Sequence, residues 1–414
     1  MSKAFTAQTI EMALQAISSA LHPTARQEIL GIDECGGRVL AQSVVAPKDI
    51  PQAPLSAMDG YAFHSSRLDK LSGDSPLTLK VLGKSLAGHG LEGQADPGSC
   101  VRIFTGAVVP PEHDTVIPQE LVAANDAGDE IRFSPDAIRP LANVRTRGED
   151  LARGAVALTK GSRMGPREIA LLASMGIASV GVTRRLRVAV ISTGDEVTDP
   201  VRPLAKGKTF DANRPMLLEL LREIGADAVD LGIVEDDPDA LRQSITHAAT
   251  ISDALITSGG VSVGEADHTR DVMQSLGDIS FWKLAIKPGR PLAAGWVGPS
   301  RIPFFGLPGN PVAAFVTFHA IVKPCLARIA GEEAVARPPL RARLAHDTKK
   351  APGRTEYLRC GLQRDPHGDW VATIARSQGA ASLKSLVDAD GLVVLPHEAG
   401  PLSAGTMVDV IALG

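Results

Sequence analysis

The chain has 414 residues, of which 44% are hydrophobic and 22% charged, the balance of a soluble globular protein with several domains. Its formal net charge of −4 lacks the basic excess that gripping a nucleic-acid backbone requires. The four cysteines lie far apart and form no C-x-x-C pair, so the pattern indicates neither a zinc site nor a disulfide framework and favours a reducing compartment.

No stretch of the sequence predicts a membrane segment. The N-terminal residues contain no apolar core of signal-peptide length. The longest uncharged stretch, residues 169–183, is shorter than the roughly 20 apolar residues that a membrane span needs. We therefore expect a cytoplasmic protein that binds neither membrane nor nucleic acid.

The pattern of apolar and turn residues changes twice in the first half of the chain. Apolar residues at helical spacing predict an amphipathic helix over 7–21. Between about 44 and 145, short apolar runs alternate with Gly, Pro and Asp turns, which is typical of a β-rich module. A further helix is predicted over 166–175.

Residues from about 185 to 330 alternate between strand and helix patterns, which predicts a parallel sheet with helices on both faces. Strands are expected within 185–197, 227–237 and 253–260, and helices within 212–226, 238–249, 265–277 and 311–331. After residue 332, several short strands indicate a small all-β module.

These patterns predict an α/β and β multidomain chain. A three-layer α/β/α domain with a mostly parallel sheet covers 181–330, and a small β-barrel-like domain covers 331–414. An N-terminal helical and linker domain is formed by 1–45 and 146–180, and a β-rich domain over 46–145 is inserted into it.

Three successive strand ends carry polar residues, namely "STGDE" at 192–196, "EDD" at 235–237 and "TSGGVSVGEAD" at 257–267. Ligands of open α/β sheets bind beyond the carboxyl ends of the strands. Each acid alone could be a helix cap, and Gly259-Gly260 could be a tight turn or a cradle of backbone amides for a phosphate. No Gly-Lys-Ser/Thr or G-x-G-x-x-G pattern follows, so ATPase and NAD-dehydrogenase functions lose their main support.

Two further stretches near the predicted sheet edge could bind a ligand, but each also has an ordinary structural explanation. Lys283, Lys287 and Arg290 flank an apolar strand and a Pro-Gly turn, and they could bind an anion or be solvated. Residues 306–314 form a fourth strand end, where a proline in the first helical turn is also structurally comfortable.

The N-terminal half carries three such stretches. Asp59-Gly60 is an ordinary turn signal, and Thr105-Gly106 ends a predicted strand. The charged residues of 143–150 would usually form a solvated hinge.

Seven motifs together resemble those of a known family. In order along the chain they are "SAMDGYA", "RIFTGAVVP", "VRTRGED", "STGDEV", "TSGGVSVGEADHT", "AIKPGRP" and "GLPGNP". Over essentially its whole length, about 5–410, the chain resembles the molybdopterin molybdenumtransferases, which insert molybdenum into adenylylated molybdopterin and are related to the E domain of gephyrin.

The resemblance implies an elongated homodimer of four-domain subunits, whose active site is completed by the partner subunit. It implies Mg2+ as cofactor, molybdate and adenylylated molybdopterin as substrates, and AMP and molybdenum cofactor as products. Transient contact with a molybdopterin adenylyltransferase is expected as well. Two alternatives stay open, which are ATP-dependent adenylylation of molybdopterin and a non-catalytic scaffold like gephyrin.

The resemblance also implies site residues. The catalytic positions would be Asp59, Thr105, Arg145, Asp150, Glu196, Asp236, Asp267, Lys283 and Lys287. The substrate-binding positions would be Ser258, Gly259, Gly260, Ser262, Arg290, Pro308, Pro311 and Arg359, with the turn at 377–379 nearby. Small hydroxyl residues expected after "NPV" and "SQG" are here Ala313 and Ala380, and Asp237 is an alternative to Asp236.

A physical hypothesis connects the acids to these substrates. A carboxylate about 4 Å from a unit anion costs ~4 kcal/mol at an effective dielectric constant near 20, so a phosphate or molybdate needs a cation between them. Mg2+ commonly bridges one or two carboxylates to substrate phosphates. We therefore expect Glu196, Asp236 and Asp267 to organise Mg2+, and Lys283, Lys287 and the Gly259-Gly260 amides to hold the anions.

Overall fold

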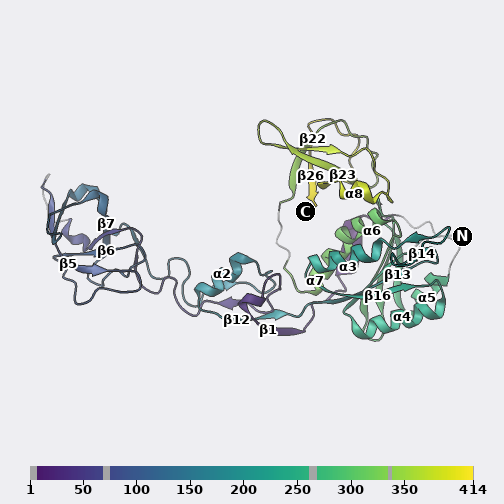
Figure 1. Cartoon of the computed structure of the whole chain (residues 1–414), viewed down its shortest axis with the longest axis horizontal. Helices are drawn as coiled ribbons and strands as arrows, with labels where there is room; N and C mark the ends of the chain where they lie inside the picture. Colours follow the sequence, from purple (N-terminus) through teal and green to yellow (C-terminus); the bar gives the residue numbers. More distant parts are fainter. Residues whose placement is uncertain (1–6, 69–74, 261–267, 334–337, 414) are drawn as a thin grey trace.

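The computed structural model describes residues 7–68, 75–260, 268–333 and 338–413 of an elongated chain. Figure 1 shows a β-rich lobe at one end, a narrow linker in the middle, and an α/β domain carrying a C-terminal barrel at the other end. The predicted fold class is confirmed, whereas the predicted domain boundaries stay a prediction.

The β-rich lobe contains one curled sheet with the strand order β7-β4-β6-β5-β9-β8. Its strands are β4 (Gly60–Phe63), β5 (Leu77–Ser85), β6 (Cys100–Ile103), β7 (Thr115–Pro118), β8 (Ala123–Ala124) and β9 (Glu130–Phe133). Phe63, Leu79 and Ile131 fill its core. At its base, β3 (Leu55–Ser56) pairs with β10 (Val144–Arg145).

The linker consists of short paired strands beside one helix. Its elements are β1 (Gln27–Gly31) paired with β12 (Ser179–Thr183), β2 (Val44–Val45) paired with β11 (Val156–Leu158), and α2 (Pro166–Ser174). Pro166 begins α2 where its missing N–H costs nothing, which confirms the helix predicted over 166–175.

The α/β domain has a sheet with the strand order β16-β13-β17-β21-β20-β18. Its strands are β13 (Arg187–Thr193), β16 (Asp227–Val234), β17 (Ala254–Ser258), β18 (Gly277–Lys283), β20 (Pro291–Val297) and β21 (Ile302–Leu307). β16, β13, β17 and β21 run parallel, whereas β20 and β18 join antiparallel at one edge. This confirms the mostly parallel sheet.

Helices cover both faces of this sheet, and the alternation along β13 shows why. Val188 and Val190 pack toward one helix layer, while Ala189 and Ile191 pack toward the other. The first layer contains α1 (Ile10–Ser18), α3 (Asn213–Glu223), α6 (Pro311–Thr317) and α7 (Lys323–Ile329). The second contains α4 (Pro238–Ile251) and α5 (His268–Leu276).

The helix at the N-terminus is shorter than expected and lies on the α/β domain rather than on the linker. Thr9 caps α1 by accepting a hydrogen bond from the amide of Met12. Ile10, Ala13 and Ile17 are buried in the same core as β13 and α7. This burial gives α1 a role in covering the sheet.

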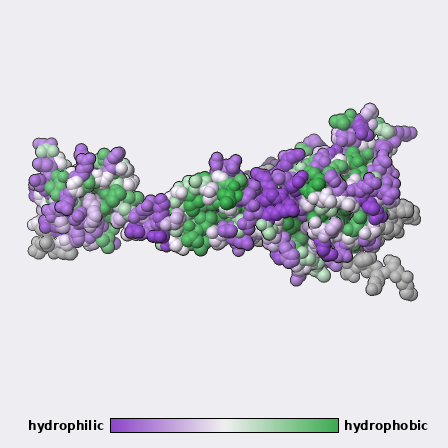
Figure 2. Space-filling model, turned by 90° about the horizontal axis from the view of Figure 1, so that it is seen from below, coloured by the Kyte–Doolittle hydropathy of each residue, from purple (hydrophilic) through white to green (hydrophobic). Residues whose placement is uncertain are grey.

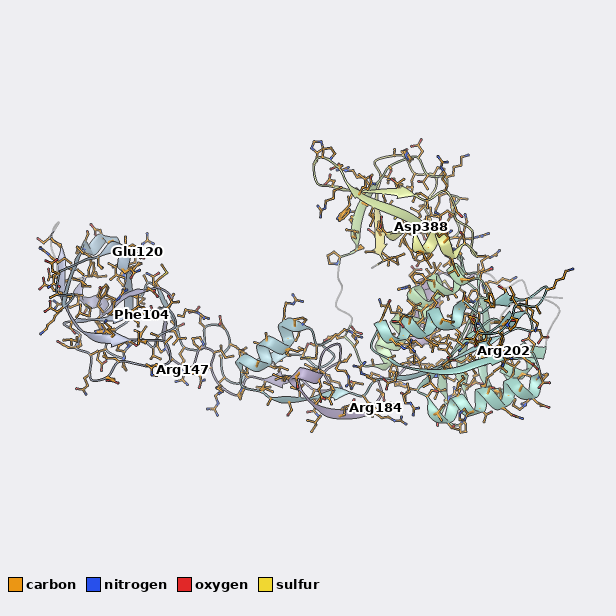
Figure 3. All side chains as sticks on the ribbon, in the orientation of Figure 1. Phe104, Glu120, Arg147, Arg184, Arg202 and Asp388 are labelled. Atoms are coloured by element: carbon orange, nitrogen blue, oxygen red, sulfur yellow. The ribbon has the colours of Figure 1, made fainter. Side chains whose placement is uncertain are left out.

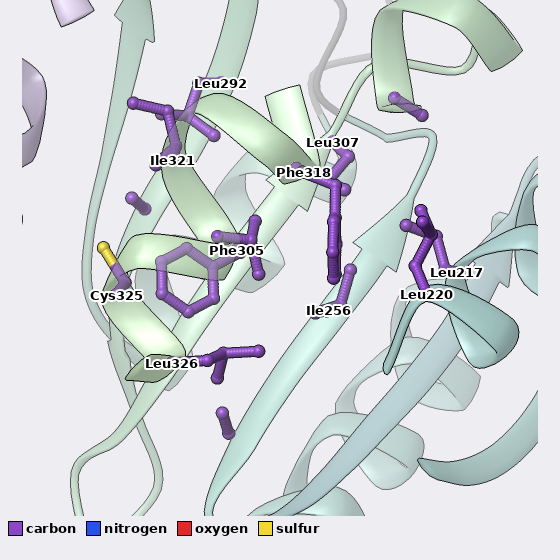
Figure 4. Packing of buried hydrophobic residues seen from close by; sticks show 14 of the residues in the cluster. Leu217, Leu220, Ile256, Leu292, Phe305, Leu307, Phe318, Ile321, Cys325 and Leu326 are labelled. Atoms are coloured by element: carbon purple, nitrogen blue, oxygen red, sulfur yellow. The ribbon is translucent and has the colours of Figure 1, made fainter. Parts of the chain in front are cut away.

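One helical run, 311–329, is long and apolar enough to cross a membrane by length and composition alone. A π-helical turn, Phe318–Val322, joins α6 to α7 within it. Phe318, Ile321 and Leu326 are buried against the sheet, where they meet Ile256 and Phe305 (Figure 4). The run therefore has the burial of a core helix.

The C-terminal barrel closes because β23 pairs with both β24 and β25. Its elements are β22 (Leu340–Leu344), β23 (Thr355–Arg364), β24 (Trp370–Ile374), β25 (Gly391–Leu395), β26 (Met407–Ala412) and the short helix α8 (Leu383–Val387). A strand from the α/β domain, β19 (Ile286–Lys287), adds to its edge by pairing with β23. The barrel is thus joined directly to the segment that follows β18.

Candidate functional site

Acidic residues meet at the carboxyl edge of the parallel sheet. The loop after β13 carries Asp195 and Glu196, and the loop after the neighbouring β16 carries Asp236. The backbone amide of Asp236 donates to Oδ1 of Asp195 at 3.2 Å. Burial raises the pKa of Asp236, and the charges of Asp195 and Glu196 raise it further.

Asp237, the alternative to Asp236, has a different role. Its side chain caps α4 by accepting hydrogen bonds from the amides of Asp239 and Ala240, at 3.1 and 2.8 Å. Capping thus occupies Asp237, whereas Asp236 lies beside Asp195 and Glu196.

The predicted metal ligands are only partly brought together. Glu196 and Asp236 lie close enough for their charges to interact, while Asp267 lies outside the described residues, as does Ser262. Within the ranges that the structure describes, no three His, Cys, Asp or Glu side chains gather in a way that could hold a metal ion. The acids supply hard oxygen ligands of the kind that suits Mg2+, but not a closed cage.

A buried arginine fixes the loop that carries Glu196. Within this loop, β14 (Val197–Thr198) pairs with β15 (Thr209–Phe210). Arg214, near the start of α3, bonds Asp199 and Asp211 at 3.0 Å each, and it also pairs with Asp230 on β16. These contacts tie both ends of the loop to the sheet and so hold Glu196 at its edge.

The glycine turn after β17 is sterically required. Gly259 has φ +91°, and a Cβ there would lie 2.5 Å from the carbonyl oxygen of Thr193. Its amide donates to the Leu307 carbonyl at 3.1 Å, so this N–H is used within the fold. The prediction that the Gly259 amide holds an anion is therefore wrong. Gly260 follows with φ +68°, in the left-handed region that favours glycine.

Asn213, at the start of α3, connects two of the strand-end loops. Its Nδ2 donates to Oγ of Ser258 at 2.7 Å and to the Gly309 carbonyl at 2.8 Å. The sequence interpretation missed this residue, because "DAN" before a helix is indistinguishable from an ordinary helix start. Its long-range partners lie 45 and 96 residues away along the chain.

The basic candidates divide between two domains. Lys283 ends β18 in the α/β sheet, whereas Lys287 lies in β19, which pairs with the barrel. The prediction that Lys283 and Lys287 flank one strand was therefore wrong, because the chain leaves the α/β sheet after Lys283 and joins the barrel at β19. Nζ of Lys287 pairs with Glu356 of β23 at 3.2 Å. Arg290 follows in the turn leading to β20 and is exposed.

Arg359 on β23 is fully buried, which is costly for a guanidinium group. Its Nη2 donates to the carbonyls of Ser377 and Gly379, both at 3.1 Å. Its Nε and Nη1 have no hydrogen-bond partner in the described part of the chain. Burial lowers the pKa of Arg359, as expected for a cation without a carboxylate beside it.

The "GLPGNP" loop brings the barrel to the sheet edge. Pro308 follows β21, and Pro311 begins α6. The next amide, that of Val312, donates to the Ala380 carbonyl at 3.0 Å. Ala380 thus contributes its backbone to this junction, and Ala313 is buried within α6. Arg359, the 377–380 turn and the start of α6 consequently form one continuous wall.

The remaining candidates lie at the other end of the molecule. Thr105 donates its amide and its hydroxyl to Oδ1 of Asp59, each at 2.8 Å, and these bonds lower the pKa of Asp59. Arg145 pairs with Asp150 and with Glu149. These carboxylates raise the pKa of Arg145.

A single chain does not bring the two groups together. In Figure 3, Phe104 and Arg147 mark the lobe and its base, and Arg202 marks the sheet edge at the opposite end. Asp59, Thr105, Arg145 and Asp150 therefore form one cluster, and the acids of the sheet edge form another.

Comparison with known proteins identifies the family. The chain is 38% identical to a molybdopterin molybdenumtransferase of Haemophilus influenzae over 97% of its own length and 98% of that protein. The chain belongs to the molybdopterin molybdenumtransferase family. A Nostoc sp. member is 34% identical and covers 93% of this chain and 88% of its own length.

The family assignment agrees with domain matches and with solved structures. Residues 8–176 match the MoeA N-terminal region (domains I and II), 189–328 a probable molybdopterin binding domain, and 341–413 the MoeA C-terminal region (domain IV). A molybdopterin biosynthesis MoeA protein from Pyrococcus horikosii superimposes with a TM-score of 0.76 at 31% identity, covering 98% of this chain and 99% of that one. The acidic edge and the glycine turn both lie in the molybdopterin-binding match.

Proposed function

We propose that the chain transfers molybdenum from molybdate to adenylylated molybdopterin and releases AMP and molybdenum cofactor. The observation that carries this proposal is the gathering of Asp195, Glu196 and Asp236 at the carboxyl edge of the parallel sheet. Family membership supplies the substrate class, since named relatives at 34–38% identity are molybdopterin molybdenumtransferases.

The acidic edge suits a phosphate-bearing substrate only if a cation shares the site. Glu196 and Asp236 offer oxygen ligands, and the pKa of Asp236 is raised first by burial and then by the charges of Asp195 and Glu196. We propose that these two residues, with Asp267, hold Mg2+ directly or through water. Bound there, Mg2+ would neutralise the pyrophosphate charge and stabilise the AMP leaving group.

The wall formed by Arg359, the 377–380 turn and the start of α6 suits an oxyanion. The Nε and Nη1 of Arg359, which are buried and have no hydrogen-bond partner among the described residues, are donors in the fixed geometry that binds planar or tetrahedral oxyanions. Lys287 lies on β19, the strand that pairs with β23, and its half-exposed side chain pairs with Glu356 of β23. Both residues are proposed to bind molybdate or phosphate oxygen, and Pro308 and Pro311 to shape the pocket between them.

We propose further that the cluster of the β-rich lobe completes the site of a partner subunit. Within one chain Asp59, Thr105, Arg145 and Asp150 lie far from the acidic edge (Figure 3). Figure 2 shows hydrophobic side chains gathered on the linker, where Ile29, Val45 and Val156 are exposed. An apolar surface in the middle of an elongated chain suits a homodimer interface.

The same proposal includes a cytoplasmic location and transient contact with a molybdopterin adenylyltransferase, which would supply the adenylylated substrate. The free, buried thiols of Cys35, Cys100, Cys325 and Cys360 fit a reducing compartment.

The test is incubation with adenylylated molybdopterin, molybdate and Mg2+, followed by measurement of AMP. We expect AMP release that needs molybdate and that falls at least about a hundredfold in Glu196→Gln and Asp267→Asn. AMP release indifferent to these substitutions would contradict the proposal. Consumption of ATP without molybdate would instead favour adenylylation of molybdopterin.

A further inference from the structure

The side-chain oxygen of Asn213 is a hydrogen-bond acceptor in an amide that lies between the loops after β17 and β21. The residue is 6% exposed, and its Oδ1 has no hydrogen-bond partner among the residues that the structure describes. A buried acceptor left without a donor is destabilising, so natural proteins rarely keep one without a reason.

The hydrogen-bond partners of the Asn213 side chain determine which way its amide group faces. The Gly309 carbonyl lies 2.8 Å from Nδ2, and a carbonyl oxygen can only accept a hydrogen bond. The nitrogen must therefore face Gly309 and Ser258, and the oxygen must face away from them. A flipped amide would place two acceptors against each other.

The neighbourhood of Asn213 consists of site elements. Ser258 immediately precedes the required Gly259 turn, and Gly309 belongs to the "GLPGNP" loop. The hydroxyls of Thr193 and Thr257, at the ends of β13 and β17, are also buried without a partner in the described ranges. Asn213 Oδ1 and the hydroxyls of Thr193 and Thr257 are thus three buried polar atoms, near the carboxyl edge of the sheet, without a hydrogen-bond partner among the described residues.

Any group that pairs with this oxygen must be a hydrogen-bond donor, and this excludes the unprotonated phosphate and molybdate oxygens of the substrates. Phosphate and molybdate oxygens accept hydrogen bonds but carry no N–H group. The aminopyrimidinone edge of a pterin carries a ring N–H and an amino group, both of which donate. Asn213 also lies inside 189–328, the range that matches a molybdopterin binding domain.

We infer that Asn213 is a substrate-binding residue whose Oδ1 accepts a hydrogen bond from the pterin ring, while its Nδ2 fixes the loops on either side. This rests on the proposed function, because it assumes a pterin substrate at the carboxyl edge. The adenine of the AMP moiety also carries an amino group, so the experiment must separate the two rings.

The experiment compares two substitutions that share the loss of Nδ2. Asn213→Ala removes donor and acceptor, whereas Asn213→Ser removes the amide and keeps a neutral oxygen that can accept a hydrogen bond. Titrations with adenylylated molybdopterin and, separately, with AMP give the dissociation constants, and thermal unfolding gives Tm. Asn125→Ala, in an exposed turn of the lobe, is the matched control for truncating an asparagine that bonds its own loop.

We expect Asn213→Ala to bind adenylylated molybdopterin about tenfold more weakly than the wild type, and AMP equally well. Asn213→Ser should lose a similar amount of Tm yet keep affinity for adenylylated molybdopterin within about threefold of the wild type, because its neutral hydroxyl oxygen can accept the hydrogen bond. If the alanine variant does not fold, this second expectation stands alone.

Equal loss of affinity in both variants would overturn the inference, since it would reduce Asn213 to a positioning role. Weakened AMP binding would overturn it by assigning Oδ1 to adenine, and unchanged binding would overturn it altogether. A wild-type chain that does not bind adenylylated molybdopterin would contradict the proposed function instead, so the two failures are distinguishable.

Discussion

At the scale of single residues, the site is organised by charges that are not balanced within the chain. Among the described residues, Asp236 lies beside Asp195 and Glu196 with no cation paired to it, and the buried Arg359 has no carboxylate partner. Buried charges without a partner of opposite sign are costly for the fold and useful for binding ions. The charges of Asp236 and Arg359 can be tested separately by substitution.

Asp236→Asn should raise the Tm of the metal-free chain at neutral pH, because it removes a partly buried charge that the carboxylates of Asp195 and Glu196 also repel. A raised pKa means that the folded state favours the protonated acid, so the contribution of Asp236 to stability is present at low pH and lost as pH rises through the raised pKa. The Tm difference between variant and wild type should therefore grow from acidic to neutral pH, and the stabilisation by Mg2+ should shrink in the variant.

The matched control for that scan is Asp237→Asn, because asparagine caps a helix about as well as aspartate. Its Tm should stay close to that of the wild type at every pH. If Asp236→Asn lowered Tm at neutral pH in the absence of metal, the carboxylates would not be repelling one another.

Arg359→Lys should weaken the binding of molybdate by about tenfold or more, since lysine keeps the charge but loses the fork of N–H donors. The measurement is the rise in Tm on adding molybdate. Arg364→Lys, at the exposed end of the same strand, should leave that rise unchanged. A full molybdate response in Arg359→Lys would remove Arg359 from the site.

At the scale of elements, the strand-end loops depend on backbone geometry. Gly259→Ala would force a Cβ against the Thr193 carbonyl at a φ that L-residues rarely adopt. We expect a loss of about 1–3 kcal/mol in the free energy of unfolding, measured by urea denaturation. Gly309→Ala, where a Cβ meets nothing within 4 Å, is the control and should cost less than half as much.

Sequence patterns predicted the elements of the α/β domain well, because β13 is a continuous apolar run, α3 has a helical spacing of apolar residues, and α4 has both that spacing and a capping Asp237. They failed where a partner is distant. β19 could not be foreseen because it leaves one sheet to pair with Thr355–Glu356 of another. Likewise, nothing near Asn213 in the sequence shows that it bonds Ser258 and Gly309.

At the scale of the whole molecule, the two clusters of predicted site residues lie at opposite ends of an elongated chain (Figure 1). If each active site combines the lobe of one subunit with the sheet edge of its partner, defects in the two clusters should complement each other. A site built within one chain could not behave in this way.

Asp59→Asn and Glu196→Gln should each be inactive alone and regain activity when their subunits are mixed after dissociation. Random mixing leaves one intact site in each heterodimer, so activity should reach about a quarter of the wild-type value. Mixing Asp59→Asn with Thr105→Val, which lie in the same cluster, should restore nothing. The absence of recovery in the first mixture would contradict a shared site.

The most direct test of the central claim is the stoichiometry of the reaction. Purified chain is mixed with adenylylated molybdopterin, Mg2+ and molybdate, and both AMP and molybdenum bound to the pterin are measured over time. The proposed function predicts that they appear together in equal amounts, and that neither forms when molybdate is omitted. AMP released without molybdenum transfer, or no AMP at all, would contradict it.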